Sequence, residues 1–295
     1  MSANATTDLS GAIGGSVPMR KRPLLGWGLH DGMVVARRNL IQSARVPESL
    51  FFSLVQPVIF VLLFAYVFGG AIPIPGDGAD PQEAANAYRN YLMPGIFGQT
   101  VAFAAAASTV GLAEDMRKGI VDRFRALPMA HGAVLFGRTF ADAIRQILVL
   151  TVLSITGLLV GWRITGGFLN AVAAYALLLL FAYTVAWIGA TVGLSMPNPE
   201  TASTAGLIWL FPLTFLSNAF VPISSMPAWL QAFAAFNPVS TLVLAVRELF
   251  GNPIGIQPDY WPLQHPGPYT LIACAILIAV FATLAVRKFG RTTSR

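Results

Sequence analysis

Charged residues are scarce in this sequence. Only 11% of its 295 residues are Asp, Glu, Lys or Arg, whereas 55% are hydrophobic and the mean hydropathy is +0.65. A soluble domain carries about 25% charged residues, so this chain has too little charge to cover a surface that faces water. The composition therefore indicates an integral membrane protein and excludes an ordinary soluble domain.

Cysteine and histidine are rarer still. The single cysteine, Cys274, lies in an apolar run, and the three histidines His30, His131 and His265 are far apart in the sequence. These counts exclude an intramolecular disulfide and a site built from several cysteines, and a zinc or di-iron centre is not expected. We therefore expect this chain to bind no metal and no cofactor itself.

Groups that would supply energy or catalysis are also lacking. The GxxxxGK[S/T] pattern with which P-loop proteins bind ATP does not occur. No acidic residue is expected in the middle of a span, although proton-driven carriers relay protons through such residues. No paired carboxylates, histidine cluster or nucleophile with a nearby base occurs at the span ends, so an enzyme is not expected. An active transporter of this kind would draw its power from a separate subunit.

Long apolar stretches are what the sequence does contain. A helix needs about 20 mostly apolar residues to cross a bilayer. Six stretches meet this requirement, at about residues 49–69, 92–113, 140–162, 169–196, 204–222 and 269–286. Asp142 and Arg145 lie three residues apart near the expected cytoplasmic start of the third, where a helical pair can form. We therefore predict an all-α polytopic integral membrane protein with six transmembrane helices.

The basic residues predict the orientation of these helices. Fifteen of the nineteen Lys and Arg residues lie in residues 1–47, 113–139 and 287–295. Basic residues beside a span stay on the cytoplasmic side, so both termini and the loop 114–138 are predicted to be cytoplasmic. Residues 1–23 are expected to be a disordered tail and 291–295 a short one. The net charge of +6 suits anionic membrane lipids better than nucleic acid, because these residues flank apolar spans.

The loop 114–138 is expected to contain an amphipathic helix. Ile120, Phe124 and Leu127 are spaced i, i+4, i+7, which places them on one helical face among basic residues. Pro128 would end this helix, and Glu114-Asp115 would suit its N-terminus. The residues leave two interpretations open, a basic anchor lying on the membrane and a helix that docks into a groove of a cytoplasmic partner.

Two further segments are expected to be helical without spanning the membrane. Residues 24–47 predict an amphipathic interfacial helix with an apolar face that includes Met33, Ala36 and Leu40. Residues 223–250 are too apolar for an ordinary loop, and Asn237-Pro238 divides them into two short helices. Each is about half the length of a span, which predicts a hairpin that dips into the outer leaflet, with Arg247 near the outer headgroups.

Three segments in this order resemble the permeases of bacterial type-2 ABC exporters. They are residues 114–138 (EDMRKGIVDRFRALPMAHGAVLFGR), residues 197–203 (PNPETAS) and residues 218–249 (NAFVPISSMPAWLQAFAAFNPVSTLVLAVREL). The similarity covers most of the chain and is closest to the daunorubicin-resistance-type permeases. It implies a permease domain over residues 48–290 in the bacterial cytoplasmic membrane. It also implies a second permease, either another copy or a related chain, and two copies of an ATP-binding cassette subunit that carries ATP and Mg²⁺.

The resemblance assigns ATPase coupling to the cytoplasmic loop. It implies that apolar side chains fill a groove on the ATPase subunit while charged ones orient the contact. The residues concerned are Glu114, Asp115, Arg117, Ile120, Arg123, Phe124, Arg125 and Leu127.

Polar and aromatic residues within the apolar spans are candidates for the substrate pathway. They are Gln56, Gln99, Gln146, Phe211 and Asn218, although hydrogen bonds between helices would also explain such residues. A pathway with so few charges should favour a hydrophobic or amphipathic small molecule, such as an antibiotic or a lipid-like metabolite. The alternatives are a channel or secondary carrier without an ATPase, an exporter of lipid or polysaccharide, and a membrane enzyme that acts on lipids.

Overall fold

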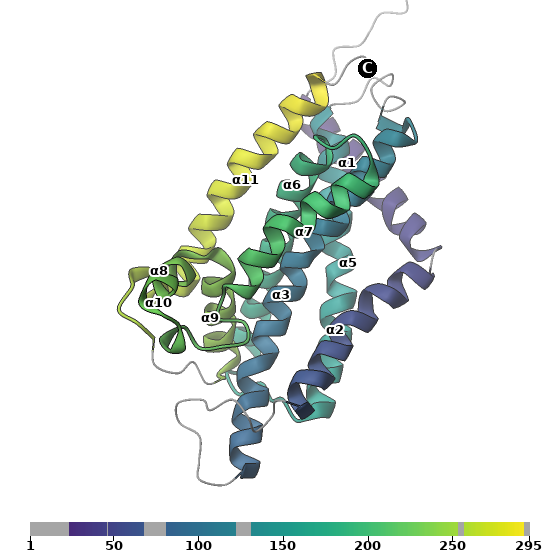
Figure 1. Cartoon of the computed structure of the whole chain (residues 1–295). Helices are drawn as coiled ribbons and strands as arrows, with labels where there is room; N and C mark the ends of the chain where they lie inside the picture. The colour runs from purple at the N-terminus through teal and green to yellow at the C-terminus, as the bar shows by residue number, and fades with distance from the viewer. Residues whose placement is uncertain (1–23, 46, 68–80, 122–130, 253–256, 292–295) are drawn as a thin grey trace, which may run out of the picture.

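The computed structural model describes residues 24–45, 47–67, 81–121, 131–252 and 257–291, and within these ranges the regular structure is entirely helical (Figure 1). The expected N-terminal tail, residues 1–23, and residues 292–295 lie outside the described residues. The helices are α1 (Leu24–Ala44), α2 (Pro47–Val67), α3 (Pro81–Arg117), α5 (His131–Val160), α6 (Phe168–Gly193), α7 (Pro199–Phe215), the 3₁₀ helix η1 (Ile223–Ser225), α8 (Ala228–Phe236), α9 (Pro238–Phe250), α10 (Trp261–Gln264) and α11 (Pro266–Arg291).

The helix α3 lies at the centre of the bundle and packs against α2, α5, α6, α7 and α9 (Figure 1). Its contact with α6 depends on Gly189 and Gly193, which are four residues apart on one face of α6. A side chain at Gly189 would overlap the backbone of Ala105, and one at Gly193 would overlap that of Thr109. Lipid tails are as apolar as a helix surface, so close backbone packing of this kind takes the place of the hydrophobic effect in holding spans together.

Within the part of the chain that the structure describes, four helices are long and apolar enough to cross a membrane, namely α3, α5, α6 and α11. The pair α8 and α9 satisfies the same test together, with a bend of 74° between them. Among the described residues α2 contributes a shorter apolar stretch, Ser53–Val67, and α7 has only 17 residues. The molecule is therefore a multi-pass membrane protein with four or five clear candidate spans, and the expected count of six is not reached by length and composition alone.

Several helices extend beyond the predicted spans. The second span, predicted at residues 92–113, lies within α3, which extends from Pro81 to Arg117. The third, predicted at residues 140–162, corresponds to α5, which begins earlier, at His131. The fifth was expected at 204–222, whereas α7 begins at Pro199, ends at Phe215 and is followed by a turn. Its early start has a local cause: the side chain of Asn198 accepts a hydrogen bond from the backbone of Thr201, and proline suits the first helical position.

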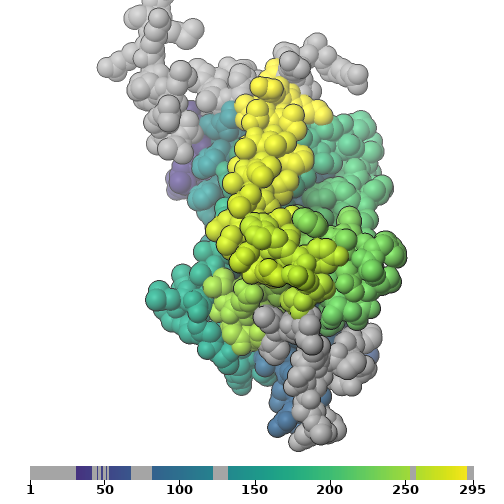
Figure 2. All heavy atoms as spheres, turned by 90° about the vertical axis from the view of Figure 1, so that its left-hand side faces the viewer, coloured from purple at the N-terminus to yellow at the C-terminus, as the bar shows by residue number. Residues whose placement is uncertain are grey.

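The helix α11 lies on the outside of the bundle, where it forms a continuous ridge in the space-filling view (Figure 2). Its outer face is apolar and exposed at Leu271, Ile272, Ile276, Val280 and Leu284. A row of exposed aliphatic side chains of this length suits contact with lipid acyl chains and would be unfavourable in water.

The predicted hairpin is present, but its two helices differ in their surroundings. The outer helix α8 exposes Trp229 and Phe233, whereas α9 is buried along most of its length. The side chain of Asn237 holds the turn between them, because it caps α9 at the backbone N–H of Val239 and donates to the carbonyl of Leu213 at 2.7 Å. The break at Asn237-Pro238 is therefore confirmed, while α9 belongs to the protein core.

Arg247 on α9 lies inside the protein, and its expected place near the outer headgroups stays a prediction. Its side chain is completely buried. The guanidinium donates to three backbone carbonyls, those of Tyr91 at 3.0 Å, Asn218 at 2.8 Å and Ala219 at 3.2 Å, and it lies 3.6 Å from the centre of the Tyr91 ring. No carboxylate pairs with it among the described residues. Arg247 therefore holds α9, α3 and the segment after α7 together.

We expect the substitution Arg247→Met to destabilise the protein by about 2 kcal/mol or more, since the buried carbonyls of Tyr91 and Ala219 lose this donor at about 1 kcal/mol or more each. The carbonyl of Asn218 keeps a second donor, the hydroxyl of Tyr91 at 3.2 Å. The measurement is the thermal unfolding of the purified chain in detergent. Arg287→Met, at an exposed position of α11, is the matched control and should change the stability little. Equal stabilities for the two variants would contradict the role assigned to Arg247.

Candidate functional site

The beginning of the predicted coupling loop is part of a membrane helix. Glu114, Asp115 and Arg117 form the last turn of α3, and Gly119 then adopts a φ of 66° and turns the chain away. The expectation that Glu114 and Asp115 begin a separate loop helix is therefore wrong. Carboxylates at the C-terminal end of a helix are electrostatically unfavourable, so neighbouring cations are needed to compensate them.

These cations are present. Asp115 forms an ion pair with Arg138 of α5, and Glu114 pairs with Lys118 at 3.1 Å. Arg117 lies 3.9 Å from Glu200 at the start of α7. The end of α3 is thus connected to both α5 and α7 through charged side chains.

The other coupling candidates divide into two groups. Arg123, Phe124, Arg125 and Leu127 lie outside the described residues. Ile120 is described and half-buried, and it lines a small pocket at the end of the bundle. The amphipathic helix predicted for this loop therefore stays a prediction.

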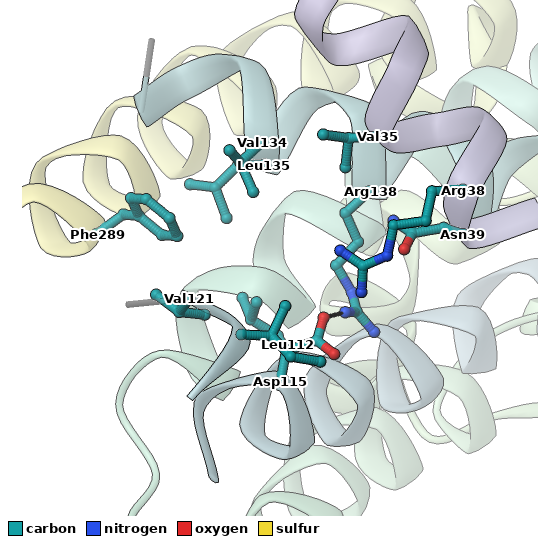
Figure 3. Close-up of a pocket in the computed structure, with 11 residues that line it drawn as sticks. Val35, Arg38, Asn39, Leu112, Asp115, Val121, Val134, Leu135, Arg138 and Phe289 are labelled. Atoms are coloured by element: carbon teal, nitrogen blue, oxygen red, sulfur yellow. Dashed lines mark hydrogen bonds and ion pairs between the residues drawn. The ribbon is translucent and has the colours of Figure 1, made fainter. Parts of the chain in front are cut away.

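This pocket joins four helices that are distant in sequence, and we call it the junction (Figure 3). Figure 3 shows Asp115 and Arg138 pointing toward each other at its centre, while Phe289 of α11 closes the opposite side. The remaining walls come from Val35, Arg38 and Asn39 of α1, Leu112 of α3, Ile120 and Val121, and Val134 and Leu135 of α5. The N-terminal helix, the loop and the last span therefore meet at one place.

The helix α1 reaches the junction because it crosses α5 at two glycines. A side chain at Gly137 would overlap the backbone of Gly32, and one at Gly32 would meet the ring of Phe136. A helix is present in the predicted segment 24–47, from Leu24 to Ala44, but its buried face centres on Gly32, Val35 and Ala36, while Met33 is 53% exposed. The helix is packed against α5, and its place at the membrane interface stays a prediction.

We expect Asp115 and Arg138 to be energetically coupled. A double-mutant cycle with Asp115→Asn and Arg138→Gln should show an interaction of about 1–3 kcal/mol in thermal unfolding, since both side chains are largely buried. Glu114→Gln with Lys118→Gln provides the control, because that pair is exposed and should contribute at most about 0.5 kcal/mol. Additive effects at Asp115 and Arg138 would show that the pair does not hold the junction.

A cavity of about 440 Å³ lies further along the same helices, between α2, α3, α5 and α7. It brings together three of the five pathway candidates, Gln56 of α2, Gln99 of α3 and Gln146 of α5. Phe60 and Phe103 add aromatic surface to its walls. These three glutamines are far apart in the sequence, so the sequence did not indicate that they line the same cavity.

The other two candidates do not line this cavity. Phe211 of α7 lies beside it, because its ring packs edge-on against Phe103 with the centroids 5.6 Å apart. Asn218 is buried in the segment after α7, where its carbonyl binds Arg247. Its side-chain amide has no hydrogen-bond partner among the described residues. Asn218 therefore belongs to the buried Arg247 contact.

Hydrogen bonding between helices explains only one of the three glutamines. Gln146 donates to the backbone carbonyl of Thr100 across the α3–α5 contact, at a long 3.4 Å. Gln56 and Gln99 form no hydrogen bond with any described residue, although the side chain of Gln99 is almost fully enclosed by the protein. Their amide groups face the cavity and are available to a molecule inside it.

Two charged residues in the cavity wall were not predicted as pathway residues. Asp142 and Arg145 form the expected ion pair on α5, and Asp142 also accepts a hydrogen bond from Ser108 of α3 at 2.6 Å. The helix α5 begins at His131, so Asp142 lies about 16 Å along it at 1.5 Å per residue, and its place near the start of the span stays a prediction. A carboxylate spaced i, i+3 from an arginine inside an apolar run was the sequence signal for this site.

We expect Gln99→Leu to leave the stability within about 0.5 kcal/mol of the parent, because no protein hydrogen bond is lost. Asn237→Leu, which removes the cap of α9 and the bond to Leu213, should cost about 2 kcal/mol in the same thermal unfolding assay. A large loss of stability in Gln99→Leu would favour a structural role for this amide over contact with cargo.

Comparisons with known proteins agree with this architecture. The sequence model of the ABC-2 type transporter family matches residues 32–250. A daunorubicin resistance ABC transporter permease of Streptomyces coeruleorubidus is 34% identical over 97% of this chain and 95% of its own length. A doxorubicin resistance ABC transporter permease of Mycobacterium tuberculosis is 27% identical over 79% of the chain and 80% of its own length. A putative transport permease of Cyanophora paradoxa is 24% identical, with 76% and 75% covered. With its helical membrane bundle and this match over most of its length, the chain belongs to the ABC-2 type transporter family, as a permease subunit.

Proposed function

We propose that this permease subunit exports a hydrophobic or amphipathic small molecule across the bacterial cytoplasmic membrane. The observation that carries the proposal is the cavity between α2, α3, α5 and α7, where unpaired amides and aromatic rings line one space. Such a mixture suits an organic molecule with a few polar groups, which is the usual composition of small-molecule sites. The printed names of two relatives, permeases for daunorubicin and doxorubicin resistance, support cargo of this kind.

The proposal includes six spans, of which α7 is short, whereas α2 with its 21 residues is about 31 Å long. At 1.5 Å per residue α7 is about 25 Å long, somewhat less than the hydrocarbon core of about 30 Å. A short span is accommodated by local thinning of the bilayer at modest cost. In this arrangement both termini are cytoplasmic, the hairpin of α8 and α9 faces the outer leaflet, and residues 48–290 form the permease domain.

ATP enters the proposal through partner subunits. Two ATP-binding cassette subunits, which bind ATP and Mg²⁺, would contact the loop 114–138 of this chain and of a second permease, either a copy or a related protein. The loop connects α3 with α5, and these same helices form much of the cavity wall. A displacement at the junction would therefore be transmitted along two packed helices to the cavity, without any intervening flexible segment.

The transport test uses inverted membrane vesicles that contain the chain and its ATP-binding subunit. We expect ATP-driven accumulation of daunorubicin, followed by its fluorescence, and no accumulation when ATP is replaced by a non-hydrolysable analogue. Uptake that follows a proton gradient and ignores ATP would instead favour a secondary carrier. Absence of uptake under every condition would contradict the proposed cargo.

The coupling test uses Phe124→Asp. A carboxylate placed in an apolar contact is costly to desolvate, so the ATP-binding subunit should no longer co-purify and transport should fall to background. Phe233→Asp, the same change on the exposed face of α8, is the control and should leave co-purification intact. Retention of the subunit by Phe124→Asp would leave the loop as a membrane anchor.

A further inference from the structure

The pair formed by Asp142 and Arg145 has a chemical role that the glutamines cannot fill. Both residues line the cavity, and together they place a charged pair in a wall that otherwise consists of amide and hydroxyl side chains, aromatic rings and aliphatic groups. Taking charges out of water is expensive, and an ion pair inside a membrane protein is often tied to function and is seldom merely stabilising. The pair therefore calls for an explanation beyond the packing of α5.

The two partners are held unequally. Asp142 is anchored twice, by Arg145 on one carboxylate oxygen and by Ser108 on the other, and its side chain is only 8% exposed. The side chain of Arg145 is 33% exposed. Within the described ranges it forms a hydrogen bond and an ion pair with Asp142 alone. A long, flexible side chain with one partner can turn away, whereas the short side chain of Asp142 cannot. The fixed charge of the cavity is thus negative and the movable charge is positive.

The geometry points to Asp142 as the acceptor for a protonated amine of the cargo, with the guanidinium of Arg145 as the group that this amine displaces. This inference rests on the proposed export function and names its substrate class, an aromatic amphipathic molecule with one positive charge. In the empty cavity Arg145 neutralises Asp142, so no buried carboxylate is left unpaired. When cargo enters, its ammonium group replaces the guanidinium of Arg145 beside Asp142. No covalent bond is formed or broken.

The rest of the cavity suits the remainder of such a molecule. Phe60 and Phe103 offer flat apolar surface to an aromatic ring system and attract positive charge through their faces. The amides of Gln56 and Gln99 offer donors and acceptors to hydroxyl or carbonyl groups. A neutral analogue would keep these contacts and lose only the one with Asp142.

The experiment measures the equilibrium binding of two fluorescent probes to the purified full-length chain in lipid nanodiscs at neutral pH. Daunorubicin carries one protonated amine, and N-acetyldaunorubicin has the same ring system with that amine acylated and uncharged. The variants are Asp142→Asn, Arg145→Gln and, as a control for the first, Asp259→Asn, which lies in an exposed segment outside the cavity.

We expect Asp142→Asn to weaken daunorubicin binding about tenfold, since it removes a charge-assisted hydrogen bond, and to leave the acetylated probe unchanged. Arg145→Gln should strengthen daunorubicin binding about threefold, because the competing cation is gone. Asp259→Asn should match the parent for both probes. Opposite effects of the two cavity variants cannot arise from partial unfolding, which would weaken the binding of both probes.

Four results would overturn the inference. Equal weakening of both probes by both cavity variants would make the pair structural. Stronger daunorubicin binding in Asp142→Asn than in Arg145→Gln would reverse the assigned roles. Failure of the parent to bind daunorubicin would remove the subsite together with the proposed cargo. ATP-driven uptake of the two probes is measured separately in vesicles. Uptake that is driven by ATP but equal for the two probes would refute the amine site and leave the proposed export function in place.

Discussion

The buried guanidinium of Arg247 is the interaction on which the outer half of this bundle depends. The chain leaves regular helix after Phe215, and the backbone carbonyls of Asn218 and Ala219 then lie inside the protein. A carbonyl buried in this way needs a hydrogen-bond donor. Arg247 donates to both and to the carbonyl of Tyr91, and because it belongs to α9 it fixes the hairpin against α3. A single cation thereby permits an irregular segment inside the protein.

The inner half of the bundle is organised by close backbone contacts and by one ion pair. Gly32 and Gly137 let α1 lie directly on α5, and Asp115 with Arg138 connects α3 to α5. The same two helices then continue to the cavity that contains Asp142. The place where an ATPase is proposed to act and the place where cargo is proposed to bind are therefore two regions of the same two helices, α3 and α5.

Much of the site could be predicted from the sequence as a set of residue types, but the arrangement of these residues in space could not. Gln56, Gln99 and Gln146 were recognised as polar groups in apolar spans, and the structure places them together because α2, α3 and α5 converge. Phe211 and Asn218 met the same criterion, yet one lies beside the cavity and the other belongs to the Arg247 contact. The sequence contains no information about which face of a nearly uniformly apolar helix turns inward, since such a helix lacks a polar side that would reveal it.

The sequence by itself determined the class of protein, the approximate position of the apolar helices and the break at Asn237-Pro238, because these follow from local composition and from proline geometry. It also determined that Asp142 and Arg145 would pair, since their spacing on a helix is fixed. Only the tertiary structure decided that this pair lines a cavity, that Arg247 is buried in the protein and that α1 packs on α5. These features depend on where helices begin and how closely their backbones approach, and both are set by contacts between residues distant in the sequence.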